Sequence, residues 1–137
     1  MAMNDVVINK VTTIERCVQR IHDVYQNNPK NLSDFTKQDS IILNIQRACE
    51  ASIDLAMHIV SERKLGVPKT SREGFKLLQE AGMIDVSLTK TLMNMVGFRN
   101  IAVLDYQALE LDILQAILDK HIDDFKNYTK VILQLEK

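Results

Sequence analysis

Aromatic residues are scarce in this sequence, and tryptophan is absent. Phenylalanine, tyrosine and tryptophan make up 5% of the 137 residues, whereas apolar residues of all kinds make up 46%. We therefore expect an aliphatic core of leucine, isoleucine, valine, methionine and alanine. Only four glycines and two prolines interrupt the chain. So few helix-breaking residues favour a small number of long helices over many short strands.

Disulfide scaffolds, targeting segments and an excess of one charge are also missing. The two cysteines, Cys17 and Cys49, lie on apolar helical faces, which predicts buried thiols. No basic segment followed by an apolar one marks a signal peptide, and no apolar run approaches the length of a membrane span. We therefore expect a cytoplasmic protein of one domain, residues 1–137. The net charge of −1 provides no general attraction to nucleic acid.

Three long segments carry apolar residues at helical spacing. Between residues 4 and 27, with Asn4 as the N-cap, one stripe contains Val7, Val11, Ile14, Val18, Ile21 and Tyr25. A second helix is expected from Thr36 to about Lys64, with Thr36 and Asp39 in capping-box spacing. Its two apolar stripes imply cover on two sides, from its own domain and from a second subunit. A last helix is expected from residue 112 to about residue 132, with a single inner stripe.

Two shorter helices are expected between these long ones. The first spans residues 71–81, with Thr70 as its N-cap and Gly82 at its end. The next begins with Ser87 as its cap and runs through Val96, and a loop follows near residues 106–110. No segment reads as a pair of strands. The sequence therefore predicts an all-α fold, an antiparallel bundle of about five helices.

Residues that could bind a metal or a cofactor form no recognisable pattern. The three histidines, His22, His58 and His121, have no partner histidine or cysteine at metal-ligand spacing. The sequence contains no glycine-rich phosphate loop. We therefore expect neither a metal nor a cofactor.

The unusual segment is residues 97–106, in which Arg99 stands among apolar residues. An arginine presents a forked donor that suits a phosphate, but it can equally pair with an acid in a structural role. The residues alone leave both readings open. Asp105 and Tyr106 could simply cap and pack the turn into the last helix.

Residues 95–106 read MVGFRNIAVLDY, which resembles the signature of the HEPN superfamily, in particular its HepT-type members. In that signature an arginine is followed some residues later by a histidine, and Leu104 occupies the histidine position here. Residues 38–51, QDSIILNIQRACEA, are similar to the second helix of the family. The resemblance therefore covers nearly the whole chain.

The resemblance implies a helical bundle that forms a homodimer, with two copies of the motif building one metal-independent ribonuclease site. Arg99 would bind and polarise the scissile phosphate of an RNA substrate, and Asn100 would support it. The family histidine would move protons at the ribose hydroxyl or the leaving oxygen. Leu104 has no titratable group, and loss of general acid–base catalysis typically costs about 10²–10⁴-fold in rate.

The resemblance also implies a partner. HepT-type toxins pair, in a type VII-like toxin–antitoxin system, with an antitoxin that resembles a minimal nucleotidyltransferase. This antitoxin transfers AMP from ATP to the tyrosine two residues beyond the histidine position, which is Tyr106. The added phosphates would place negative charge where the RNA phosphate binds.

Three functions are compatible with these residues. The first is a ribonuclease toxin disabled by Leu104, the second a non-catalytic HEPN module that binds a nucleotide or a nucleotidyltransferase, and the third a structural dimeric bundle. The leucine fits either an inactivating substitution or a natural member that binds without cutting. The otherwise intact motif favours the disabled toxin.

Overall fold

The part of the chain that the structure describes, residues 4–104 and 109–135 of a computed structural model, contains six α-helices, one 3₁₀-helix and no strand. The elements are α1 (Asp5–Tyr25), η1 (Pro29–Ser33), α2 (Phe35–Glu62), α3 (Ser71–Glu80), α4 (Val86–Leu104), α5 (Leu111–Lys120) and α6 (Asp124–Leu135). The predicted all-α class is confirmed. None of these helices has the length and apolar character needed to cross a lipid bilayer.

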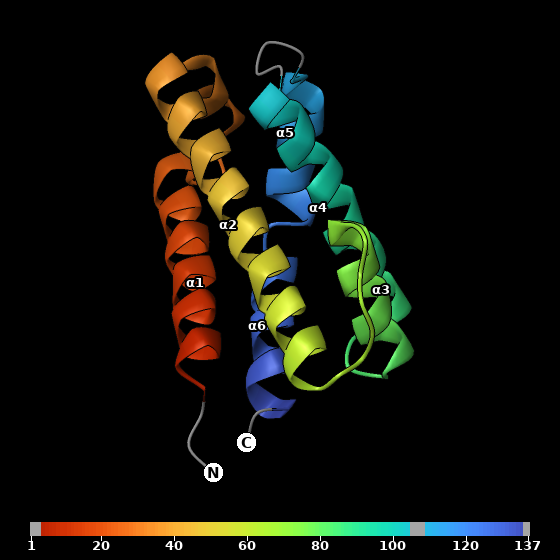
Figure 1. The fold of residues 1–137 in the computed structure, drawn as a ribbon. Coiled ribbons are helices and arrows are strands. Elements are labelled where there is room, and N and C mark those ends of the chain that lie inside the picture. The colour runs from red at the N-terminus through yellow and green to blue at the C-terminus, as the bar shows by residue number, and fades with distance from the viewer. Residues whose placement is uncertain (1–3, 105–108, 136–137) are drawn as a thin grey trace.

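Helices α1 and α2 form an antiparallel pair, with α2 in the centre of the bundle and α1 at its outer side (Figure 1). Helix α2 packs against α1 on one side and against α3 and α4 on the other. Both apolar stripes of α2 are buried by these contacts within a single chain, from Ile41 to Val60. The expected burial of α2 on two sides is confirmed, and because one chain provides it, the width of the apolar surface does not require a second subunit.

Helix starts follow the capping rules, but two of them lie earlier than the sequence suggested. The side chain of Asn4 accepts a hydrogen bond from the Val6 amide at 2.8 Å, as expected. Helix α2 is capped by Asp34, two residues before Thr36, because the extended backbone of Asp34 lets its carboxylate reach a free amide of the first turn. Helix α4 is capped in the same way by Asp85 and not by Ser87.

The predicted last helix is divided in two at residues 121–123. The break allows α5 to pack on η1 while α6 turns to pack along α1. Polar contacts from α1 hold both sides of the break. The Tyr25 hydroxyl donates to Asp119 at 2.8 Å, and His22 Nε2 lies 3.1 Å from Asp123 Oδ1. The bundle therefore has six helices where about five were expected.

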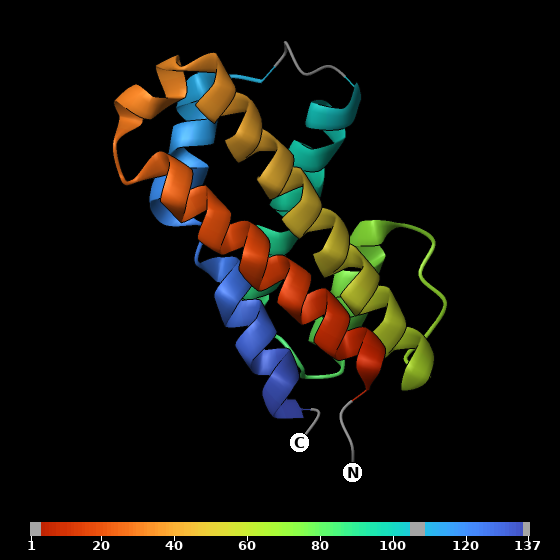
Figure 2. The same ribbon diagram turned by 90° about the vertical axis from the view of Figure 1, so that its left-hand side faces the viewer.

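The two ends of the bundle differ. Helix α1 begins and α6 finishes at one end (Figures 1 and 2). Helix α4 finishes at the opposite end, where η1 and the start of α2 also lie. The residues of the arginine motif are therefore at the end far from the first residues of α1.

Candidate functional site

The last turns of α4 carry the three motif residues that the structure describes: Arg99, Asn100 and Leu104. The Arg99 side chain is half-buried, and its Nε donates to Asn100 Oδ1 at 3.0 Å. Asn100 thus lies where a supporting polar contact was expected. Because this bond uses Nε, the two terminal amino groups of the guanidinium can still donate to the oxygens of an anion such as phosphate.

The Cys49 thiol lies between α2 and the inner side of α4, and it contacts the Met95 carbonyl at 3.5 Å. Burial raises the pKa of Cys49 to about 12, and the nearby positive charge of Arg99 opposes that rise. Burial also raises the pKa of Cys17. Both cysteines are buried and free, as predicted, and protonated thiols are poor nucleophiles. Neither cysteine is therefore suited to act as a nucleophile at this site.

Leu104 is the most exposed of the three motif residues, with 84% of its side chain open to solvent. It lies five positions after Arg99, which corresponds to about 140° around a helix of 3.6 residues per turn. The two side chains therefore leave α4 in different directions. Within one chain, the side chains of Arg99 and Leu104 therefore do not point toward the same position.

Gly97 explains how a second arginine approaches the motif. A Cβ atom at this position would lie 2.9 Å from Nη2 of Arg72. Arg72 comes from α3, and its Nε donates to the Met93 carbonyl at 3.2 Å. Glycine thus leaves room for the Arg72 guanidinium, which would have to shift if a larger residue stood here. Sequence reasoning missed Arg72, because nothing in the local spacing connects α3 with the motif.

An apolar groove of about 390 Å³ separates α4 from α5, with Phe98, Ile101 and Ile113 among its lining residues. Ile101 and Ile113, which line the groove, are exposed, and so are Val103, Leu104 and Leu111 on the same two helices. Apolar surface concentrated in this way usually marks a site of association. The groove adjoins the turns of α4 that carry Arg99.

Each of the three histidines lies beside a carboxylate. His58 Nε2 is 2.9 Å from Glu62, and His121 Nδ1 is 3.2 Å from Asp124. None of the three histidines belongs to α4. Within residues 4–104 and 109–135, no three histidine, cysteine, aspartate or glutamate side chains are grouped as a metal site.

Comparison with known proteins identifies the family. Residues 14–132 match the family described as ribonuclease HepT-like. The chain belongs to the HepT-like family. It is 49% identical over 130 residues to the mRNA nuclease HepT of Shewanella oneidensis, and the match covers 95% of this chain and 98% of that protein. The HEPN resemblance of residues 95–106 is thereby confirmed.

Solved structures of HepT-like toxins share this fold. A tri-AMPylated Shewanella oneidensis HEPN toxin, in complex with an MNT antitoxin, superposes with a TM-score of 0.91 at 48% identity, covering 96% of this chain and 99% of that one. A toxin–antitoxin complex with AMP-PNP gives a TM-score of 0.91 at 47% identity, with the same coverage. Tyr106, the expected modification site of this HepT-like chain, and its neighbour Asp105 lie outside the described residues.

Proposed function

We propose that this chain is the ribonuclease toxin of a toxin–antitoxin pair and that Leu104 disables its catalysis. The observation that carries the proposal is the Arg99–Asn100 contact on α4, in a chain that is 49% identical to an mRNA nuclease. The proposed substrate is RNA and the proposed partner a nucleotidyltransferase antitoxin. We place the pair in the cytoplasm, where RNA and ATP are both available.

The chemistry assigned to Arg99 follows from its geometry. Its forked guanidinium binds the scissile phosphate and stabilises the charge that develops on it. Asn100 orients the fork by accepting from Nε. Leu104 can neither accept nor release a proton, so the attacking hydroxyl and the leaving oxygen lack a general acid–base group. The chain with leucine therefore binds RNA without cutting it efficiently.

We also propose that two copies of the chain form a homodimer through the apolar groove between α4 and α5. Arg99 and Leu104 diverge on one α4, so a second copy is needed to bring both motif positions to one phosphate. The exposed side chains around the groove, Ile101 and Ile113 among them, provide the apolar surface that such a contact needs. The active site is then composite, with a motif from each copy.

The variant Ile113→Asp is expected to convert the dimer into a monomer. A charge at the proposed interface would be buried without a partner, and buried unpaired charges are costly. Ile113 is 52% exposed in the single chain, so the fold itself should tolerate the change. The mass in solution, from light scattering after size-exclusion chromatography, provides the measurement.

Val67→Asp provides the matched control. Val67 is 91% exposed and lies between α2 and α3, away from the groove. It should leave the mass in solution unchanged. A dimer that persists in folded Ile113→Asp, or that dissociates equally in Val67→Asp, would rule out this interface.

The proposed AMP acceptor is Tyr106, and the other two tyrosines support this choice by their burial. Tyr25 is 1% exposed and donates to Asp119, and Tyr128 is 0% exposed and donates to the Ser52 carbonyl. Burial raises the pKa of Tyr25 to about 12 and also raises that of Tyr128, so both hydroxyls stay protonated. A transferase acting on the folded chain would find neither of them accessible.

When the protein is incubated with its partner nucleotidyltransferase and ATP, we expect AMP to be added to the unchanged chain. The Tyr106→Phe variant should receive none. In this step the tyrosine oxygen bonds to the α-phosphorus of ATP, pyrophosphate leaves, and the phenolic proton is released. Intact-protein mass spectrometry measures the addition, and peptide mapping gives its position. Equal addition to the Tyr106→Phe variant would contradict the assignment.

A non-catalytic module that binds a nucleotide or a nucleotidyltransferase is the second candidate function, and Leu104 is the observation that favours it. Restoring histidine at this position distinguishes the two candidates. A disabled ribonuclease regains RNA cleavage that depends on Arg99. A binding module keeps its partner and still cuts nothing.

A further inference from the structure

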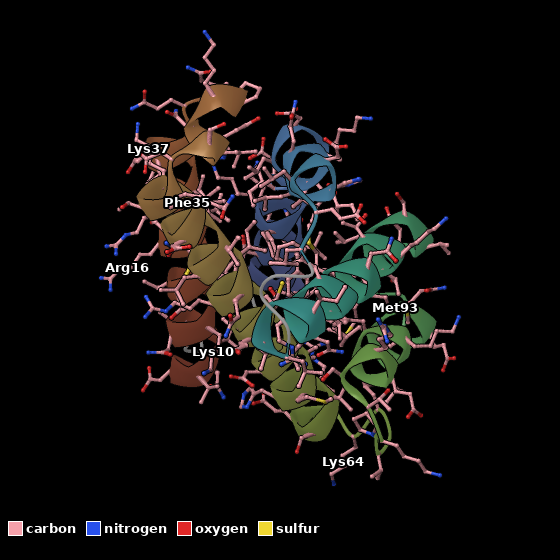
Figure 3. All side chains as sticks on the ribbon, turned by 90° about the horizontal axis from the view of Figure 1, so that it is seen from above. Lys10, Arg16, Phe35, Lys37, Lys64 and Met93 are labelled. Carbon is pink, nitrogen blue, oxygen red and sulfur yellow. The ribbon has the colours of Figure 1, made fainter. Side chains whose placement is uncertain are left out.

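Three arginines converge on a second site, in the groove between α1 and α2. A cavity of about 200 Å³ is lined there by Thr13, Arg16, Cys17, Arg20, Asn44 and Arg47. The site contains none of the motif residues of α4. Figure 3 shows Arg16 on the α1 side of the molecule, whereas Met93 of α4 lies on the opposite side.

The arrangement of the three charges is unfavourable for the chain alone. Arg16 and Arg20 are four residues apart on α1, so they project from the same face, where like charges repel. Arg47 adds a third positive charge from α2. All three side chains are exposed. Such a cluster is stabilised when an anion binds between the guanidinium groups.

No acidic neighbour neutralises the cluster. None of the three arginines forms an ion pair within residues 4–104 and 109–135. The acidic residues that come after these arginines on α1 and α2 have other hydrogen-bond partners. Asp23 accepts from Gln19, Glu50 from Gln46, and Asp54 from Lys10. The three guanidinium groups therefore have no carboxylate bound to them and can donate to a ligand from outside the chain.

The floor of the groove is built from buried groups. Asn44 is 5% exposed, and its Nδ2 donates to the Ser40 carbonyl at 2.8 Å, which fixes the amide in the wall of the cavity. Cys17 is 6% exposed beside it. Burial raises the pKa of Cys17, while the charges of Arg47 and Arg20 act against this rise, so both guanidinium groups lie near the floor. The cavity is therefore a defined pocket of α1 and α2.

We propose that Arg16, Arg20 and Arg47 form a second phosphate-binding site that holds the RNA backbone on the far side of α2 from Arg99. This inference rests on the proposed ribonuclease function and adds a positioning site to it. A helix with its side chains is about 10–12 Å across, which corresponds to about three nucleotides at 3.4 Å per nucleotide. One RNA strand can therefore reach both sites.

The lining of the groove favours RNA over a protein ligand. It contains no exposed apolar side chain, whereas the core of a protein interface is usually apolar or aromatic. Arginine forks match the two free oxygens of a phosphodiester. Because the net charge of the whole chain is −1, the chain as a whole does not attract a polyanion. The attraction must come from a local group of positive charges such as this cluster.

The test compares two triple variants that lose the same charge. One is Arg16→Gln, Arg20→Gln and Arg47→Gln, and the other is Lys76→Gln, Lys90→Gln and Lys126→Gln, whose lysines are exposed on α3, α4 and α6. Binding of a fluorescein-labelled single-stranded RNA to the uncut Leu104 chain is measured by anisotropy over a range of salt concentrations. Circular dichroism confirms that all chains are folded.

The arginine triple variant should bind RNA at least tenfold more weakly. It should also reduce the slope of log K against log salt by about 2, since each lost phosphate contact on a single strand contributes about 0.7. The lysine triple variant should leave both quantities close to those of the parent. Equal changes in the two variants would mean that only net charge matters, and the site would be refuted.

The outcome separates this inference from the proposed function. If Leu104→His cuts RNA and the arginine triple variant binds RNA normally, the second site fails and the ribonuclease stands. If the parent binds no RNA, the second site fails, and cleavage by Leu104→His decides the function independently. If the arginine triple variant loses its nucleotidyltransferase partner but not RNA, the groove is a protein-docking surface and the proposal is overturned.

Discussion

The Leu104→His variant is expected to cleave RNA about 10²–10⁴-fold faster than the chain with leucine, which is the usual contribution of general acid–base catalysis. The reason is chemical. In the proposed site, Arg99 and Asn100 form the half that binds phosphate, and their contact does not involve residue 104. An imidazole at this position would supply the missing proton transfer near neutral pH.

The fold should not change with this substitution. The Leu104 side chain is 84% exposed at the end of α4, so the core loses little when it is replaced. Substitutions at such positions usually change the free energy of unfolding by no more than about 0.5 kcal/mol. Urea unfolding of both chains verifies this point, and a gain of cleavage then reflects chemistry alone.

Arg99 provides the controls for the same experiment. In the Leu104→His background, Arg99→Ala should abolish the gained cleavage, because the phosphate loses its forked donor. Arg99→Lys keeps the charge without the fork and should recover only part of the rate. The assay is run without added metal and with a chelator present. Cleavage that survives Arg99→Ala would contradict the phosphate-binding role proposed for Arg99.

If the Leu104→His variant does not cleave RNA, this result would decide between the two candidate functions. The protein must be folded, dimeric and free of AMP for this result to count. If it then binds its nucleotidyltransferase but cuts no RNA, the non-catalytic module becomes the better description. The activity assay should therefore be run beside a binding assay on the same preparation.

Phe75→Ala should destabilise the folded chain by about 3–5 kcal/mol, the usual cost of removing a buried aromatic side chain. Phe75 is 1% exposed on α3, and its ring meets that of Tyr128 on α6 edge-on, with centroids 5.9 Å apart. The substitution leaves a cavity between the two helices. This loss is a large part of the roughly 5–15 kcal/mol typical of a domain, and urea unfolding measures it.

Tyr128→Phe is the matched variant for the same contact. It keeps the ring and removes the hydroxyl that donates to the Ser52 carbonyl at 3.0 Å. The expected cost is about 1 kcal/mol, the net value of one hydrogen bond. Because both rings remain, this variant separates the contribution of the hydroxyl from that of the ring packing. A smaller loss for Phe75→Ala than for Tyr128→Phe would contradict this account of the core.

The helices could be predicted well wherever one apolar stripe carries the information. The stripe from Val7 to Tyr25 predicted α1 because its spacing fits a single buried face. The break between α5 and α6 could not be predicted in this way, since the apolar positions continue through it. It depends on contacts with α1, such as Tyr25 to Asp119, between residues far apart in the sequence.

Contacts within the candidate site could be predicted only where the residues adjoin in sequence. Arg99 and Asn100 are neighbours, and their contact was expected from the motif. Arg72 reaches the motif from α3, and Arg47 reaches Arg16 and Arg20 across the α1–α2 groove. Such encounters depend on how helices pack. In the sequence, each of these arginines looks like an ordinary solvated charge.

The placement of the first and last helices has a practical consequence. Helix α1 begins and α6 finishes at the end of the bundle opposite to the last turn of α4 (Figures 1 and 2). A fluorophore or an affinity handle attached at the start of α1 or at the end of α6 would therefore be remote from Arg99. Energy transfer between two labelled copies could follow self-association in real time without a reporter group crowding the RNA.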